Sequence, residues 1–445
     1  MRRARRPVLG SLLQGLLLLA IGCEDPEPLA VPEAPEAHEA TTGAPPVEAV
    51  EVPSVVAEAA PATAPIEAPA EGCRLSETED LGRAAWSDVV TFGDGFAVAL
   101  LTSDADGESL QLYDVSSEPP RSMGQARLDL PAGARRGSGP ALASVGRRLM
   151  AAYVDGGSRL RVVVLSGRPR LTPRTVAEGA SLRFRPALAV ADEGWAVAWT
   201  NAHDTPMRVF SRALRADGQP VGDEQDHTPL AGGAAAPTMV AGASPPRLLF
   251  LDPRQATSVC LGAAWSEGAF AAAEVARPVG LVTEPPEIAA VRLGADDWLA
   301  YTGIGNLATT AVGFVSLASA DDPGLLVPGT GYGTLHVDGA PMMEGAVLVA
   351  DAPLAAPPSS PRELHVRAVS PTGALGQTLT VAGPDAHADR GRIAARGDGR
   401  VAVTYRSAEH TWLADVRCAV PAETPEDAPV ETPEEALDGP SSDAP

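Results

Sequence analysis

The clearest pattern along the chain is a short apolar, β-like segment that recurs with a period close to 50 residues. Its seven copies occupy residues 96–100, 149–153, 195–199, 247–251, 297–301, 346–350 and 401–405, so successive copies start 46 to 55 residues apart. Each copy follows a strand-like run and a tight turn, and a segment of alternating apolar and polar residues comes after it. This order predicts three or four strands in each repeat and almost no helix.

Turn residues support this interpretation. Asp94-Gly95 and Asp398-Gly399 come directly before copies of the recurring strand, and this pair is typical of hairpins that need positive backbone angles. Repeats of 40 to 50 residues with three or four strands each are typical of β-propellers, whose blades bury their faces against their neighbours. We therefore predict an all-β fold, a β-propeller with seven blades of about 50 residues. The fourth and sixth repeats match least well, which leaves six or eight blades as alternatives.

The N-terminus has the layout of an export signal. Four arginines within the first six residues precede an apolar stretch over residues 12–21, which is too short to span a membrane. Residues 19–23, Leu-Ala-Ile-Gly-Cys, resemble the lipobox of bacterial lipoproteins, although Leu19 stands one position early and Ala20 takes its usual place. The resemblance implies that residues 1–22 are removed, that Cys23 is lipidated, and that the exported protein is anchored to the cell envelope. We expect this to be the outer membrane of a Gram-negative bacterium.

Composition separates the rest of the chain into three parts. Residues 23–71 are rich in Pro, Ala and Glu and predict a disordered tether, and residues 421–445 predict a disordered acidic tail. The propeller domain is expected at residues 72–420. The net charge is -23, but 11 of the 57 acidic residues lie in residues 24–71 and 8 in residues 421–445. The remaining domain is only mildly acidic, which argues against nucleic acid as a partner because phosphate binding needs a basic patch.

The two ends of the predicted domain can close the ring. The last repeat lacks one strand, and residues 73–76 belong to no repeat of their own, so they can complete the last blade and cover its edge. This closure places Cys73 and Cys418 on neighbouring strands, and we predict a disulfide between them in an oxidising compartment. Cys260 lies in the apolar run 259–265, which indicates a buried, inert thiol.

Motifs for catalysis and metal binding are weak. The seven histidines show no zinc-ligand spacing, and no Gly-x-Ser-x-Gly motif is present, so we predict no catalytic residue, metal site or cofactor. Three acidic residues at alternate positions, Asp104, Asp106 and Glu108, begin like a calcium loop but fit a hairpin tip better. Trp195 and Trp199 lie on one face of a recurring strand, which favours packing over sugar stacking. Asp192, Glu193, Asp296 and Asp297 are candidates for a glycosidase pair. Asp296-Asp297 precede a strand where Asp-Gly turns occur in other repeats, so turn chemistry explains this pair better.

These observations favour a membrane-anchored, non-enzymatic propeller that binds or scaffolds an unknown protein or carbohydrate ligand at the envelope. Two alternatives stay open. One is a propeller-type carbohydrate-active enzyme, a glycosidase or lyase, and the other is an outer-membrane assembly factor. The repeats themselves match no specific functional family, and a propeller fold hosts binding, hydrolysis and structural roles alike.

Overall fold

The computed structural model describes most of the segment from Gly72 to Val420. The described residues are 72–104, 107–117, 119–128, 138–165, 171–201, 206–229, 232–253, 257–283, 285–304, 310–318, 324–327, 335–353 and 361–420. The predictions for the signal peptide, Cys23, the tether and the acidic tail concern residues outside this set, and Asp106 also lies outside it.

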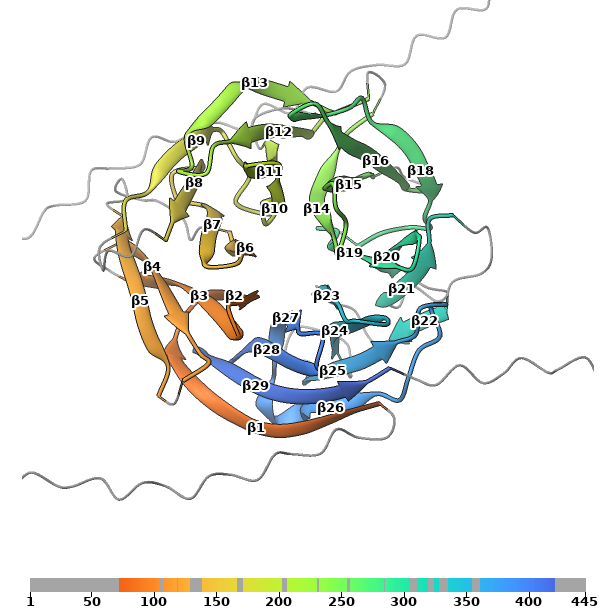
Figure 1. The fold of residues 1–445 in the computed structure, drawn as a ribbon. Coiled ribbons are helices and arrows are strands. Elements are labelled where there is room, and N and C mark those ends of the chain that lie inside the picture. Colours follow the sequence, from red (N-terminus) through yellow and green to blue (C-terminus); the bar gives the residue numbers. More distant parts are fainter. Residues whose placement is uncertain are drawn as a thin grey trace, which may run out of the picture. The chain divides into compact units, whose positions relative to one another are not determined.

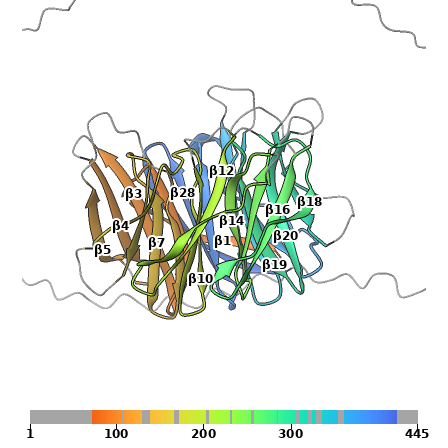
Figure 2. The same cartoon turned by 90° about the horizontal axis from the view of Figure 1, so that it is seen from above.

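The predicted all-β propeller is confirmed. The described residues form strands β1 to β29 and one short 3-10 turn, η2 (Pro384–Ala386). Seven blades of antiparallel strands, two of them joined into one nine-stranded sheet, surround a common axis, with the first strand of each repeat innermost (Figure 1). A view perpendicular to this axis shows the blades standing side by side (Figure 2). Among the described residues, no helix has the length and apolar character needed to cross a bilayer.

The first four blades follow one another in sequence order. Blade 1 consists of β2 (Trp86–Phe92), β3 (Gly95–Asp104), β4 (Gly107–Asp114) and β5 (Arg121–Leu128). Blade 2 consists of β6 (Ala141–Val145), β7 (Arg148–Val154), β8 (Arg159–Val164) and β9 (Arg174–Glu178). Blade 3 consists of β10 (Ala187–Ala191), β11 (Gly194–Asn201), β12 (Arg208–Leu214) and β13 (Pro220–Asp226). Blade 4 consists of β14 (Ala235–Ala241), β15 (Arg247–Asp252), β16 (Val259–Ser266) and β18 (Glu274–Pro278), with the two-residue β17 (Ala269–Phe270) beside β16.

The last three blades complete the ring. Blade 5 consists of β19 (Ile288–Leu293), β20 (Asp296–Ile304), β21 (Thr310–Ser316) and β22 (Gly324–Val327). A two-residue parallel pairing joins its inner strand to β14 of blade 4. Blade 6 consists of β23 (Val337–Pro341), β24 (Ala346–Pro353), β25 (Arg362–Val369) and β26 (Leu379–Ala382). Blade 7 consists of β27 (Asp389–Ala395), β28 (Arg400–Ser407) and β29 (His410–Ala419), and β1 (Gly72–Arg83) is its outer strand.

Ring closure also follows the prediction. β1 pairs antiparallel with β29 at the outer rim of blade 7 (Figure 1), with Cys73 opposite Cys418. The two cysteines form a disulfide with a Cα–Cα distance of 4.0 Å. The bond joins residues 345 positions apart, so it restricts the unfolded chain strongly. Cys260 is a free, buried thiol, as predicted, and burial raises its pKa to about 12.

The core lies between the blades and not at the axis. Trp195 and Trp199 are both buried in the cluster that joins blades 2 and 3, where they pack with Met150 and Val162. Their predicted packing role is confirmed. At the turns, Gly399 has the expected positive φ of 80°, but between β2 and β3 the positive angle falls on Gly93 and not on Gly95.

Candidate functional site

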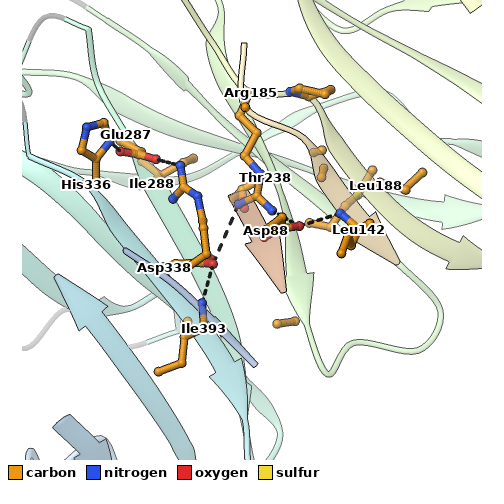
Figure 3. Close-up of a pocket in the computed structure, with 18 of the residues that line it drawn as sticks. Asp88, Leu142, Arg185, Leu188, Thr238, Glu287, Ile288, His336, Asp338 and Ile393 are labelled. Atoms are coloured by element: carbon orange, nitrogen blue, oxygen red, sulfur yellow. Dashed lines mark hydrogen bonds and ion pairs between the residues drawn. The ribbon is translucent and has the colours of Figure 1, made fainter. Parts of the chain in front are cut away.

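The central channel contains a cavity of about 280 Å³. Its walls come from the seven innermost strands and from the loops that lead into them. Ionised and aliphatic side chains both line the cavity (Figure 3). Each blade contributes its first strand to the channel wall, so residues far apart in sequence meet at the axis.

One group of charges centres on Glu287, in the loop before β19. Its Oε1 lies 2.6 Å from Arg392 Nη2, and its Oε2 lies 2.5 Å from His336 Nδ1 (Figure 3). The backbone N–H of His336 in turn donates to Asp351 at 2.5 Å. The three residues thus join blades 5, 6 and 7 at the axis.

The electrostatics of this group follow from burial and pairing. Burial favours the neutral form of Glu287, but Arg392 and His336 outweigh it and lower the pKa of Glu287 to about 2. Burial also favours a neutral imidazole, yet Glu287 and Asp351 raise the pKa of His336 above its ordinary value. Arg392 is only 3% exposed, and its pKa is raised despite burial by the same carboxylate. Glu287 is therefore ionised at neutral pH and cannot act as a proton donor there.

The second group centres on Arg185, which precedes β10 in blade 3. Its Nη2 lies 2.5 Å from Asp88 Oδ2 in blade 1, and its Nε donates to the carbonyl oxygen of Pro140 at 2.7 Å. Nη1 lies 3.8 Å from Asp338 Oδ2 in blade 6. Arg185 therefore reaches across the channel to the opposite side of the ring (Figure 3).

Asp88 is the most deeply buried carboxylate of this second group, at 2% exposure. Its Oδ2 also accepts the backbone N–H of Leu142, from blade 2, at 2.6 Å. Burial raises the pKa of Asp88 to about 6, because desolvation and the neighbouring Asp338 outweigh the stabilising charge of Arg185. Asp88 thus changes its ionisation near neutral pH, and its hold on Arg185 changes with it.

The aliphatic part of the wall is formed by small and branched side chains. Ala141 and Leu142 come from β6, Ala187 and Leu188 from β10, and Ile288 from β19. All five are buried. A bound molecule would therefore meet both charged and aliphatic side chains.

Aromatic side chains do not offer a stacking surface in the described part of the chain. Trp86 lines the cavity, but the guanidinium of Arg390 lies 3.7 Å from its ring centroid, and a Cβ on Gly139 would lie 3.1 Å from Trp86 Cε3. None of the aromatic side chains that the structure describes is exposed. A lectin-like site, which needs an exposed ring, gains no support from these residues.

None of the four carboxylates considered from the sequence lines the cavity. Asp192 and Glu193 form the turn between β10 and β11, at the end of β10 remote from Arg185, and Asp192 accepts the Trp265 N–H at 2.8 Å. The turn interpretation was wrong for Asp297, because this residue lies in β20 with 4% exposure. It pairs with Arg247 at 2.5 Å and Arg292 at 2.8 Å, which links blades 4 and 5.

The possible calcium loop is a hairpin, as favoured from the sequence. Asp104 and Glu108 lie on either side of the turn between β3 and β4. Glu108 is 1% exposed and accepts the N–H of Gly156 in blade 2 at 3.1 Å. Within the described ranges, no group of three or more His, Cys, Asp or Glu residues has the arrangement of a metal site.

Sequence reasoning did not single out the channel charges. Asp88, Asp338 and Arg392 lie in the inner strands β2, β23 and β27. A charge at a register where other repeats carry alanine was the available signal. Arg185 and Glu287 lie in loops just before inner strands, where nothing in the sequence distinguishes them from surface residues.

No protein-family model matches the chain, and no curated protein matches it in sequence. The fold is similar to that of a puromycin-hydrolysing peptidase of Mycobacterium tuberculosis, with 19% identity and a TM-score of 0.42 over 72% of this chain and 50% of the peptidase. It is also similar to a variant of Aleuria aurantia lectin in complex with Fucα1-6GlcNAc, with 11% identity, a TM-score of 0.39, and 67% and 100% of the two chains covered. The third similar structure is TolB from Acinetobacter baumannii, with 12% identity, a TM-score of 0.38 and 64% of each chain covered. This chain thus spans half of the peptidase, and at such similarity none of the three indicates a function for it.

Proposed function

We propose that this protein is an exported, lipid-anchored propeller that binds a ligand in its central channel and does not act as an enzyme. The observation that carries the proposal is the pairing of charges around a narrow cavity. Arg392, Glu287 and His336 engage one another, and Arg185 engages Asp88. Such pairing fixes side chains in one arrangement, which suits recognition by a rigid site.

The same pairing disfavours acid–base catalysis. A general acid needs a proton at neutral pH and access to the reacting atom. Glu287 holds no proton there because its pKa is lowered to about 2, and Asp88 is buried with its Oδ2 taken by Arg185 and the Leu142 N–H. Both carboxylates therefore serve to position their basic partners.

An activity screen tests the non-enzymatic part of the proposal. The purified protein is incubated with chromogenic glycosides, with a uronate polysaccharide whose cleavage creates an absorbing double bond, and with peptidyl substrates. We expect no turnover above buffer. Turnover that disappears in Glu287→Gln but persists in Glu274→Gln, an exposed carboxylate on β18, would overturn the proposal in favour of an enzyme.

Anchoring is tested by the intact mass of the membrane-extracted protein beside a Cys23→Ala variant. We expect the wild type to lack residues 1–22 and to carry acyl chains, which hold a protein at about 0.8 kcal/mol per buried methylene. The variant should be unacylated and should leave the membrane fraction. An unacylated wild type would make this a soluble exported protein and would refute the anchor without affecting the channel.

A further inference from the structure

Arg185 has hydrogen-bonding capacity that the protein does not use. Its Nε donates to Pro140 and its Nη2 to Asp88, but Nη1 lies 3.8 Å from Asp338, beyond hydrogen-bond distance. No described residue accepts from Nη1. The side chain is 24% exposed and lines the cavity, so the unused edge of the guanidinium is available to a molecule inside it.

A second unused donor lines the same cavity. Ser138 is 2% exposed, and its hydroxyl has no hydrogen-bond partner among the described residues. It lies two residues before Pro140, whose carbonyl oxygen holds Arg185. A buried hydroxyl without a partner costs stability and is rare in native proteins, which points to an acceptor supplied by a ligand.

The other residues that line the cavity limit the kind of ligand that can carry the accepting group. Leu142, Leu188 and Ile288 are buried aliphatic side chains on this wall, and the cavity of about 280 Å³ is at the lower end of the range of ligand sites. Two other arginines line the cavity: Arg392 is 3% exposed and is engaged by Glu287, and Arg183 is exposed to solvent. The Nη1 edge of Arg185 makes no hydrogen bond to a described residue, although it lies within ion-pair distance of Asp338, and it matches a group with a single negative charge on a compact apolar body.

We infer that the channel binds the carboxylate of a compact apolar acid, with the guanidinium of Arg185 as its receptor and the Ser138 hydroxyl as a second donor. The inference rests on the proposed binding function and names its ligand class. Two sources supply this chemistry: a free short-chain aliphatic acid, or the C-terminal carboxylate of a polypeptide that ends in an apolar residue. The first fits wholly inside the cavity, and the second leaves its chain at the channel mouth.

Calorimetric titration with defined probes distinguishes these sources. The probes are isovalerate, an acetylated tripeptide that ends in leucine with a free carboxylate, and the same tripeptide as its C-terminal amide. We expect the amide to bind at least about tenfold more weakly than the acid, since a hydrogen bond to a charged group is lost. Tighter binding of isovalerate than of the tripeptide acid assigns the free acid, and the reverse assigns a polypeptide terminus.

Three variants locate the site. Arg185→Gln should weaken binding of the acid by at least about tenfold, and Ser138→Ala by about two- to fivefold. Ser138→Ala leaves every ion pair in place, so the test does not depend on the folding of Arg185→Gln. The control Arg148→Gln removes an exposed arginine at the turn between β6 and β7 and should leave binding unchanged.

Two results overturn the inference: neither acid binds, or the amide binds as tightly as the acid. If the amide binds equally well and Leu188→Trp abolishes it by filling the cavity, the binding function stands and only the carboxylate assignment fails. Failure of the proposed function has a different signature, which is turnover in the substrate screen.

Discussion

The innermost strands differ in chemistry at one shared register position, which is charged in three adjacent blades, called here the charged half, and alanine in three others, called the alanine half. The position lies opposite the fourth residue of the recurring strand in six blades, whereas a bulge in β14 interrupts it in blade 4. Blades 6, 7 and 1 carry Asp338, Arg392 and Asp88 there, whereas blades 2, 3 and 5 carry Ala141, Ala187 and Ala289. The fold is the same in both halves, so only the side chain differs.

Both aspartates use the position in the same way. Asp88 accepts the N–H of Leu142 from blade 2, and Asp338 accepts the N–H of Ile393 from blade 7 at 3.2 Å. The alanine blades pack without such a bond, so the propeller does not require a charge at this register. Buried ion pairs contribute little net stability compared with apolar packing. The charged half is therefore better explained by what the channel binds than by what holds the ring together.

The largest effect is expected from breaking the ion pair between Glu287, which precedes β19 in blade 5, and Arg392 of the charged half. Glu287→Leu leaves Arg392 buried with no ionised partner at Glu287's position, which should lower the free energy of unfolding by about 3–5 kcal/mol. Urea denaturation measures the change. The double variant Glu287→Leu/Arg392→Met should recover part of the loss, because it removes the unpaired charge. A loss below about 1 kcal/mol in the single variant would mean that the pair is not needed to hold blades 5 and 7.

Placing a charge in the alanine half should lower the free energy of unfolding somewhat less. Ala289→Asp puts a carboxylate at a position that is 3% exposed among apolar neighbours, and we expect a loss of about 2–4 kcal/mol at neutral pH. The loss should shrink in acid, where the new carboxyl group is neutral. Ala289→Asn is the matched control, since it has the same shape without the charge. Equal stability of the Asp and Asn variants at all pH values would show that both halves tolerate charge equally.

More of the fold than of the site could be predicted from the sequence. The recurring strand has a local signature, and Cys73 and Cys418 mark the two ends of the ring, so repeat number and closure followed from pattern alone. The site depends on contacts between blades: Arg185 meets Asp88 and Asp338 only because the ring brings blades 3, 1 and 6 to one axis. Asp297 shows the same limit, because its local sequence indicated a turn while its partner Arg247 comes from another blade.

The pH dependence of stability should also separate the two groups of charges. The folded-state pKa of Asp88 is raised from 3.8 to about 6, so its protonated form favours folding, and this contribution is lost as pH rises through about 6. Glu287 has the opposite sign: its pKa is lowered from 4.5 to about 2, and its contribution is lost as pH falls below about 4.5.

Asp88→Asn isolates the first of these terms. From about pH 5 to about pH 8, the wild type should lose about 1.4 kcal/mol of unfolding free energy relative to the variant, as measured by urea denaturation across that range. Asp217→Asn, at an exposed turn after β12, is the control and should run parallel to the wild type. Parallel curves for Asp88→Asn would show that Asp88 keeps an ordinary pKa in the ring.

The smallest expected effect is on ligand binding, and it depends on the charges around Arg185. Arg185 faces the carboxylates Asp88 and Asp338, and Arg392 lies close to both. Glu287 and His336 hold Arg392 from the other side. When Asp88 becomes neutral it still accepts the Leu142 N–H but binds Arg185 less tightly, which leaves more of the guanidinium for a ligand. Binding of the probe acid to the wild type should therefore tighten as pH falls from about 7 to about 5.5.

Asp88→Asn should bind the same acid about threefold more tightly than the wild type at neutral pH, and its affinity should no longer change over that pH range. Calorimetric titration of isovalerate at several pH values measures both. Weaker binding by the variant would contradict a competition between Asp88 and the ligand. It would mean instead that the Asp88 carboxylate holds Arg185 in the orientation that the ligand needs, so that the charged half acts as a preformed receptor and not as one that the ligand must open.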